Sequence, residues 1–314
     1  KGKVVMGFDP GYVNGCKIAV VDASGKFLDE AIVYPHKPQS KTEQAKKILK
    51  KLIETYKIDV IAIGNGTASR ESETLISELI KELGVNTQYI IVNEAGASIY
   101  SASELAAEEH PDINVSIRGA ISIGRRLQDP LAELVKIDPE SIGVGQYQHD
   151  LNKKRLKEVL DGVVEDSVNK VGLDLNTASH SLLEHIAGVS KTVAKNIIVY
   201  REENGPFKSR NELKKVKRLG PSAFVQCAGF MRIENGKNPL DNTGVHPESY
   251  DICKKMLEIL GYSLDDVKNK NISDIDERIE NIGLKNLSEK LNVGEVTLKD
   301  IILEIKKPGR DPRE

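Results

Sequence analysis

All of the strand signals in this 314-residue chain lie in its first 150 residues, and this uneven distribution constrains the fold more than any other feature. Segments with helical periodicity at 42–56 and about 71–83 alternate with the later apolar runs, and others follow at about 97–109 and 114–137. Such alternation predicts an α/β layer structure with a mixed sheet. The five expected strands span residues 4–9, 17–22, 27–34, 59–64 and 89–92.

Beyond residue 150 the periodicity is helical, and glycine and proline interrupt it repeatedly. We therefore expect an all-α region after the α/β domain at 1–150. Its expected parts are a connecting helix at 151–178, paired short helices at 179–234, a linker rich in Asn, Gly and Pro at 235–249, and a C-terminal helical segment at 250–314.

Composition excludes several classes of protein. Hydrophobic residues make up 39% of the chain and charged residues 29%, and no apolar run approaches the roughly 20 residues that span a bilayer, so we expect no membrane partner. Cys16, Cys227 and Cys253 are widely separated and form no CxxC pair. This argues against a zinc site and a disulfide framework, and it favours the cytoplasm.

Positive charge is concentrated in one short block. Residues 176–234 carry a net charge of +5, whereas residues 1–150 carry −4, and the whole chain carries −2. A local basic block in a weakly acidic chain is typical of a segment that contacts nucleic acid.

That basic block contains two similar units, each an apolar helix, a tight turn and a second apolar helix, with turns at 187–194 and 218–224. Glycine lets backbone N–H groups approach a phosphate, and the N-terminus of the second helix favours the same anion. A plain packing unit of two helices remains the alternative. The residues that we expect to contact phosphate are Gly188, Ser190, Lys191, Thr192, Lys217, Arg218, Gly220 and Ser222.

These units, with their connector "IIVYREENGPFKSRNEL", resemble tandem helix-hairpin-helix nucleic-acid-binding units. In that family each turn carries two glycines separated by one apolar residue. Here the first turn has Gly188 but Ser190 at the second position, and the second turn has Arg218 at the first position but keeps Gly220. Contacts of this kind would position a nucleic-acid backbone without reading sequence.

The opening "GFDPGYVNGCKIAVVD" resembles the first strands of the RNase H-like fold, in the branch of YqgF and Holliday-junction resolvases. The resemblance implies a divalent-metal site for Mg²⁺ or Mn²⁺, although nucleic-acid binding itself would require no cofactor. The resolvase pattern places an acid where this chain has Gly64. On the YqgF pattern the candidate metal-ligating and catalytic residues are Asp9, Glu94 and Asp129.

Each of these acids also has a structural explanation. Asp9 precedes Pro10-Gly11 in ordinary turn chemistry, and Glu94 can simply begin a loop. Asp129 stands directly before Pro130, which is typical of a helix N-cap.

The two regions together resemble the Tex family of transcription accessory proteins. The stretches that carry this resemblance are "GNGTASRE", "NEAGASIYSASELAAEEHPD", "RGAISIGRRLQDPLAELVKIDPESIGVGQYQHD" and "NTGVHPESY". It implies a scaffold that binds RNA or DNA without sequence preference and works with the transcription machinery. It also implies a central fragment, because members carry a helical region before this part and an OB-type RNA-binding domain after it.

Two other functions stay open at this point. One is a metal-dependent nuclease or junction resolvase, in which the three acids would act directly. The other is a protein-interaction platform that uses the helical tail after Tyr250, although the sequence contains no motif that supports this function.

Overall fold

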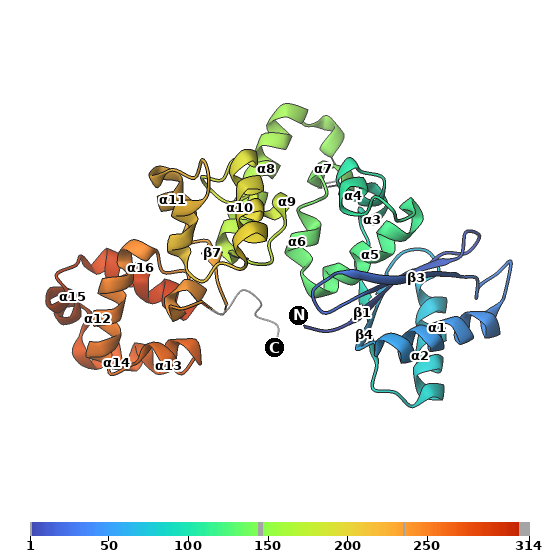
Figure 1. The fold of residues 1–314 in the computed structure, drawn as a ribbon, viewed down its shortest axis with the longest axis horizontal. Helices are drawn as coiled ribbons and strands as arrows, with labels where there is room; N and C mark the ends of the chain where they lie inside the picture. Colours follow the sequence, from blue (N-terminus) through green and yellow to red (C-terminus); the bar gives the residue numbers. More distant parts are fainter. Residues whose placement is uncertain (1, 144–146, 235, 308–314) are drawn as a thin grey trace. The chain divides into compact units, whose positions relative to one another are not determined.

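The computed structural model describes residues 2–143, 147–234 and 236–307, and its contacts divide the chain into two compact units, Lys1–Lys157 and Glu158–Glu314 (Figure 1). The first unit is an α/β domain and the second is almost entirely helical. No helix among the described residues has both the length and the apolar character needed to cross a membrane.

A five-stranded mixed sheet forms the centre of the first unit, with strand order β3-β2-β1-β4-β5. The first three strands form the expected antiparallel meander, and β4 and β5 continue the sheet in parallel with β1. Asp9 is the last residue of β1 and pairs with Lys17 of β2. The strands are β1 (Val5–Asp9), β2 (Cys16–Val21), β3 (Phe27–Val33), β4 (Val60–Gly64) and β5 (Gln88–Val92).

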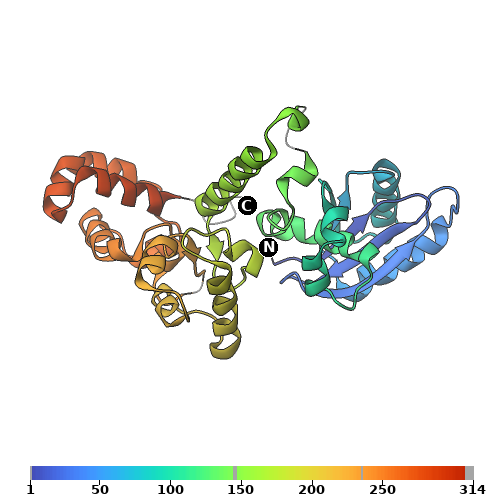
Figure 2. The ribbon, with the colours of Figure 1, turned by 90° about the horizontal axis from the view of Figure 1, so that it is seen from above.

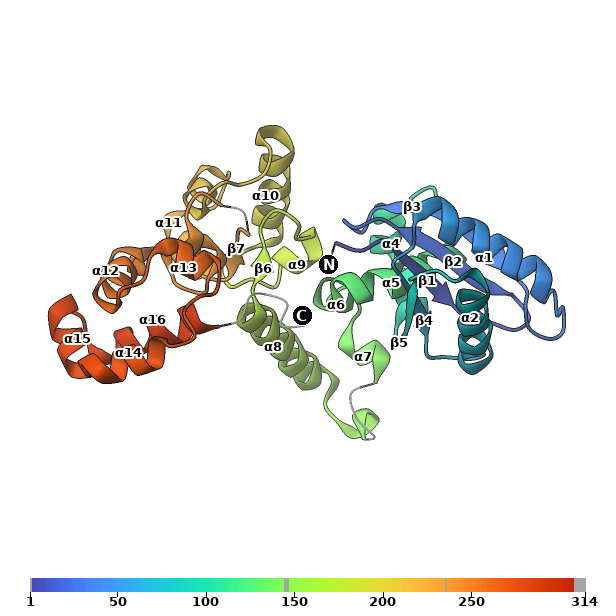
Figure 3. The same cartoon turned by 90° about the horizontal axis from the view of Figure 1, so that it is seen from below.

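Helices cover both faces of this sheet (Figure 3). Helices α1 (Thr42–Tyr56) and α2 (Ser69–Leu83) pack on the face that carries Met6 and Phe8. Helix α5 (Val115–Gln128) packs on the opposite face. Since side chains alternate along a strand, Asp9 shares the α5 face with Val5 and Gly7.

The close packing of α5 on β1 depends on glycine. A Cβ atom added to Gly7 would lie 1.9 Å from the carbonyl oxygen of Ala120, so no side chain fits at this position. The contact fixes the position of α5 beside the C-terminal end of β1, where Asp9 lies.

The two long helices expected at about 97–109 and 114–137 are each interrupted. Ser103 caps a new helix by accepting a hydrogen bond from the Ala106 N–H, and Asp129 does the same for Ala132. Both interruptions follow from side-chain capping, which competes with helix continuation. The resulting helices are α3 (Ala97–Ser101), α4 (Glu104–Glu109), α5 and α6 (Pro130–Leu134), followed by α7 (Pro139–Ile142) and a 3₁₀ turn, η1 (Gln148–Asp150).

The second unit begins within α8 (Lys153–Val171), the long helix that the sequence predicts. The strands among its described residues are one parallel pair of two residues each, β6 (Leu173–Asp174) and β7 (Met231–Arg232), which the expectation of an all-α region did not include. Between these strands lie α9 (His180–Leu183), α10 (Lys191–Asn204), the 3₁₀ helix η2 (Arg210–Lys215) and α11 (Pro221–Cys227).

The expected linker at 235–249 is wrong for the part that the structure describes, 236–249. It forms the 3₁₀ turns η3 (Pro239–Asn242) and η4 (Pro247–Ser249), and Leu240 and Val245 are buried in the core of the helices that follow. Asn, Gly and Pro here make tight turns over a packed interior.

The guanidinium of Arg210 ties this segment to the preceding helices. Its side chain is 1% exposed and donates hydrogen bonds to the carbonyl oxygens of Met231, at 2.6 Å, and Val245, at 2.7 Å. It also donates to the Tyr250 hydroxyl at 2.9 Å. A buried charge held by carbonyl groups on both sides makes residues 236–249 part of the folded unit.

The chain continues as five helices around the same apolar core, coloured orange to red in Figure 2. Residues 308–314, which the sequence predicts to precede a further domain, lie outside the described residues. The helices are α12 (Tyr250–Leu260), α13 (Leu264–Lys268), α14 (Ile275–Ile282), α15 (Leu284–Leu291) and α16 (Glu295–Lys306).

Candidate nucleic-acid interface and carboxylate pair

The two hairpin turns of the second unit have the same backbone conformation. Gly188 and Arg218 both have positive φ, +78° and +66°, and each is followed by a buried apolar residue. Ser190 and Gly220 come next, with φ −76° and −78° and ψ 162° and 173°, as the N-caps of α10 and α11. The structure therefore aligns Gly188 with Arg218, and Ser190 with Gly220.

This alignment explains which of the two family glycines can be replaced. The second position is extended backbone, which any residue adopts, and the Ser190 hydroxyl there accepts a hydrogen bond from the Val193 N–H at 3.3 Å. The first position is left-handed, which costs a residue with a side chain about 1–2 kcal/mol. Arg218 bears that cost and Gly188 does not.

All eight residues that the sequence predicts to contact phosphate are exposed. The apolar residue in the middle of each turn, Val189 or Leu219, is only 7% or 6% exposed and packs into the interior. Helix α10 has 14 residues, so its N-terminus at Lys191 presents first-turn donors and the positive end of a helix dipole. Both turns thus offer backbone and cationic groups to solvent.

The two hairpins also pack reciprocally. The Asn196 side chain of α10 donates a hydrogen bond to the carbonyl oxygen of Lys217, in the turn of the second hairpin, at 2.8 Å. The first turn lies against α11, since a Cβ atom on Gly188 would be 2.7 Å from the Gln226 Oε1 atom. The eight residues therefore belong to one paired structure.

The connector between the hairpins serves this packing. Arg201 donates to the carbonyl oxygens of Leu175 and Ala178, at 3.1 and 3.2 Å. The Phe207 ring is buried and stacks on Tyr200 with 4.9 Å between centroids. These residues hold the two turns in place and do not belong to the exposed set.

Two further turns with the same geometry occur in the last helices, and sequence reasoning missed them. Gly261, with φ +77°, precedes the N-cap Ser263, and Asn292, with φ +52°, precedes the N-cap Gly294. The spacing of a glycine or asparagine, an apolar residue and a serine or glycine was the signal that could have revealed them.

These two turns differ from the first pair because an acidic residue lies at the start of the helix that follows each of them. Asp266 closes a capping box with Ser263, so a carboxylate of the chain already occupies the N-terminus of α13. Glu295 takes the first position of α16. An acid at a helix N-terminus opposes a phosphate at the same place, so the first two turns suit an anion better than these two.

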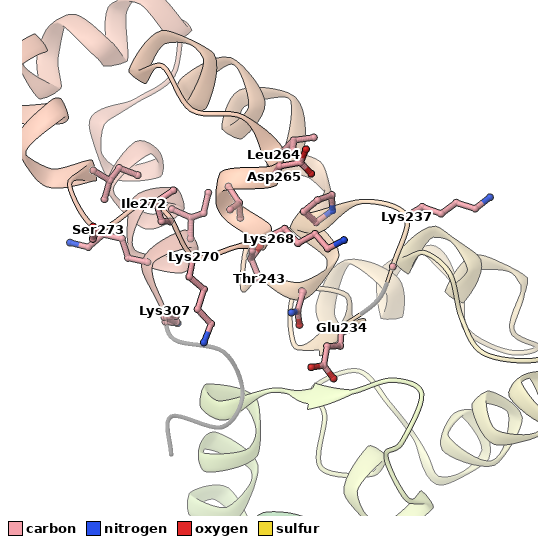
Figure 4. A pocket seen from close by; sticks show the side chains of 17 residues that line it. Glu234, Lys237, Thr243, Leu264, Asp265, Lys268, Lys270, Ile272, Ser273 and Lys307 are labelled. Atoms are coloured by element: carbon pink, nitrogen blue, oxygen red, sulfur yellow. The ribbon is translucent and has the colours of Figure 1, made fainter. Parts of the chain in front are cut away.

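A cavity of about 740 Å³ lies between the segment containing η3 and the loop that follows α13 (Figure 4). Its lining includes Lys237, Lys268 and Lys270 together with Glu234 and Asp265. Two further lysines of the lining, at the end of α16, form ion pairs with neighbouring acids. Mixed charge of this kind does not select a phosphate.

In the first unit the structure brings together two of the three predicted acids. Asp9, at the end of β1, lies beside Gly119 of α5, where an added Cβ atom would be 3.3 Å from its Oδ2 atom. Burial and, after it, the charge of Glu94 together raise the pKa of Asp9 to about 6, while the charge of Lys17 opposes the shift. Asp9 and Glu94 thus form a carboxylate pair close enough for mutual repulsion.

The Glu94 carboxylate lies beside Gly64, the position at which the resolvase pattern has an acid. A Cβ atom on Gly64 would lie 2.1 Å from the Glu94 Oε2 atom, and one on Gly66 would lie 1.7 Å from Oε1. The carboxylate from the end of β5 therefore fills the space in which a side chain of β4 would begin. Its buried Oε2 atom has no hydrogen-bond partner among the described residues.

The predicted triad is corrected by the position of Asp129. Asp9 lies beside Gly119, and Asp129 follows the end of α5, ten residues further, or about 15 Å along the helix axis. Its side chain caps α6, as the alternative explanation held. Among the described residues no three His, Cys, Asp or Glu side chains gather in a way that could hold a metal ion.

Arg126 is a residue of this site that the sequence did not assign. It is 4% exposed and donates through Nη1 to the carbonyl oxygens of Asn93 and Ala95, at 2.7 and 2.9 Å, on either side of Glu94. It thereby positions the loop that carries Glu94. Its spacing of seven residues from Gly119, which places both on one helix face, was the available signal.

Family profiles match three parts of the chain. A Tex protein YqgF-like domain matches residues 3–128, a helix-hairpin-helix motif matches 168–232, and an HHH domain matches 238–313. The last match covers the two turns with acidic helix starts.

Relatives match nearly the whole chain. Transcriptional accessory protein Tex of Neisseria gonorrhoeae is 53% identical over 309 residues, which is 98% of this chain and 40% of that protein. Protein YhgF of Escherichia coli (strain K12) is 51% identical, over 99% of this chain and 39% of that protein. S1 RNA-binding domain-containing protein 1 of Homo sapiens is 41% identical, over 98% and 36%. The chain spans about two fifths of the length of these relatives.

Among solved structures, Thermus thermophilus RuvC in complex with a Holliday junction substrate is similar at 14% identity and a TM-score of 0.29, over 38% of this chain and 90% of that chain. A score this low carries no argument, and the RNase H-like fold of the first unit rests on its strand order and on the YqgF-like match. The YqgF-like domain is followed by two helix-hairpin-helix matches, and about half of the residues are identical to those of Tex and YhgF over nearly the whole chain. The chain therefore belongs to the Tex family.

Proposed function

We propose that this chain binds the sugar-phosphate backbone of RNA or DNA without sequence preference, through the two basic hairpin turns of the second unit. The observation that carries the proposal is the set of eight exposed residues on two turns of identical backbone conformation. The net charge of +5 in residues 176–234 supports it, as does the match of this segment to a helix-hairpin-helix motif.

Within a cell we propose that this binding serves transcription, in contact with the transcription machinery. The support is the name of a relative, the transcriptional accessory protein Tex of Neisseria gonorrhoeae. The three free cysteines support a cytoplasmic location.

The salt dependence of binding tests the phosphate contacts. Each phosphate neutralised on duplex DNA contributes a slope of about −0.9 in log K against log salt concentration. A variant with Lys191, Lys217 and Arg218 all changed to Gln should bind more weakly and lose up to about 3 from that slope. Fluorescence anisotropy with labelled strands at several salt concentrations measures both.

A matched control removes three charges elsewhere. Lys47, Lys50 and Lys51 are exposed on α1 of the first unit, and their change to Gln should leave the slope unaltered. If both triple variants behaved alike, the hairpin turns would not be the site.

The pair formed by Asp9 and Glu94 favours a second candidate, metal-dependent cleavage of nucleic acid. Two carboxylates suit one Mg²⁺ or Mn²⁺ ion that keeps several waters, and they are too few for a two-ion site. A bound ion would supply activation of water, while Arg126 would hold the Glu94 loop in place. Incubating labelled RNA, duplex DNA and a four-way junction with Mn²⁺ tests this. Fragments made by the wild type and not by Asp9→Asn would establish cleavage, and intact substrates would exclude it.

A further inference from the structure

An apolar groove adjoins the second hairpin turn. It has a volume of about 570 Å³, which is within the range of about 300–1,000 Å³ typical of ligand pockets. The turn itself forms one wall, through residues 219–221. The rest of the lining comes from η2, from α11 and from residues 247–250, which comprise η4 and the first residue of α12.

The lining of the groove is mainly apolar. Leu219 and Phe224 belong to it and are 6% and 5% exposed, and Pro221 and Pro247 contribute rigid apolar faces. Tyr250 also lines the groove, and hydrogen bonds of its hydroxyl restrict the orientation of its ring. Its hydroxyl donates to Asp241 at 2.6 Å and accepts from Arg210 at 2.9 Å.

One cation lines the groove and two more lie in the adjoining turn. The Lys214 Nζ atom lies 4.7 Å from the centroid of the Phe224 ring, and Lys217 and Arg218 are exposed in the adjoining turn. Glu248 is the one acid that lines the groove among the described residues. An apolar slot bordered by cations matches a ligand that combines a flat ring with a negative charge.

The groove is also continuous with the proposed phosphate contacts, because Gly220 belongs to both. A phosphate held at this turn would bring the attached nucleoside to the edge of the groove. We propose that the groove takes an unstacked base of a single-stranded nucleic acid whose backbone lies on the second hairpin turn. This inference rests on the proposed function and adds a preference to it.

The preference follows from the cost of exposing a base. In a duplex each base is already stacked and paired, whereas the bases of a single strand are free to stack on protein groups. Stacking of one base is worth enough to change affinity by about tenfold or more. We therefore expect tighter binding of single strands than of duplexes of equal length.

The test compares a thymidine oligonucleotide with an abasic sugar-phosphate strand of the same length and charge. The wild type should bind the strand with bases about tenfold more tightly. Val225→Glu, which puts a charge in the groove wall, should bring this ratio close to one. Val199→Glu is the matched control, because Val199 on α10 is 45% exposed, Val225 is 46% exposed, and the added charge is the same. It should keep the tenfold ratio.

Each outcome separates this inference from the proposed function. An equal ratio in the two variants, or a wild-type ratio near one, would overturn the base site and leave the phosphate contacts standing. No binding of either strand by the wild type would refute the proposed function itself. A second measurement needs no variant: the emission of 2-aminopurine in the strand should fall on binding if the base stacks, and unchanged emission would also overturn the inference.

Discussion

At Arg218 a charged side chain stands where the backbone conformation favours glycine. Its φ of +66° matches that of Gly188 in the first hairpin, where no side chain resists the conformation. The left-handed backbone of Arg218 lowers stability, but its exposed guanidinium adds a cation at the proposed phosphate contact. Strain of this kind is commonly retained where a residue has a binding role.

Replacing Arg218 with Gly should therefore separate stability from binding. We expect the free energy of unfolding to rise by up to about 1 kcal/mol, because relief of the left-handed strain outweighs the added flexibility of glycine. Affinity for nucleic acid should fall, with the salt slope reduced by about 1. Urea unfolding and anisotropy measure the two effects. A stability decrease would contradict the strain, and unchanged affinity would contradict the contact.

Asp9 should make the stability of the first unit depend on pH. Its pKa is raised from an ordinary value of 3.8 to about 6, first by burial and then by the charge of Glu94. The folded state therefore holds the proton more tightly than the unfolded state. The stabilisation is complete below pH 4 and is lost as the pH rises through about 6.

Asp9→Asn removes this titration. At pH 7.5 the variant should be more stable than the wild type by about 2–3 kcal/mol, and at pH 4 the two should be nearly equal. Urea unfolding at both values measures the difference. An equal effect of the substitution at the two pH values would show that Asp9 does not carry a raised pKa.

At the scale of elements, Arg210 joins the hairpin region to the helices after it. Leucine at this position would leave buried carbonyl groups of both segments without donors, among them those of Met231 and Val245. We expect Arg210→Leu to lower the free energy of unfolding by about 3 kcal/mol. Urea unfolding gives the value, and Arg201→Leu, which frees two carbonyl groups in the connector, should cost less. Equal costs would remove Arg210 from its joining role.

The five strands and the first two helices of the first unit could be predicted from sequence to within one or two residues at each end. The helix expected at 42–56 is α1, Thr42–Tyr56, and the first expected strand, 4–9, is β1, Val5–Asp9. Apolar periodicity is a local property, so local reasoning recovers it. The interruption at Ser103 was missed, and the N-cap that Asp129-Pro130 indicates was not used to end the helix expected at 114–137, because periodicity alone does not weigh capping against helix continuation.

At the scale of the whole molecule, the second unit does not end where composition places a linker. Because Arg210 makes buried contacts with the segment after residue 236, we expect that the basic hairpins fold stably only together with the last helices. We expect a chain of residues 158–307 to fold and to bind nucleic acid, and a chain of residues 158–234 to unfold at a much lower temperature. Circular dichroism melts compare them. A stable shorter chain would restore the linker that the sequence predicts.

The sequence by itself indicated the order of the elements in the first unit and the two basic turns, and its resemblances pointed to the Tex family and to Asp9, Glu94 and Asp129 as candidate metal ligands. The elements and the turns follow from periodicity and from turn chemistry, both of which act over a few residues. The sequence also indicated that Gly188 and Arg218 occupy the first glycine position of their turns. The positive φ angles of both residues agree with this assignment.

Tertiary structure alone decided which distant residues meet. Asp129 matches a family position in sequence, but the length of α5 carries it away from Asp9 to cap α6. Glu94 reaches the space beside Gly64 because two neighbouring parallel strands end at one edge of the sheet. The groove beside Gly220 likewise needs Pro247, from the segment that composition marks as a linker, and Tyr250, the first residue of α12. Such contacts depend on long-range packing, which no local pattern of residues records.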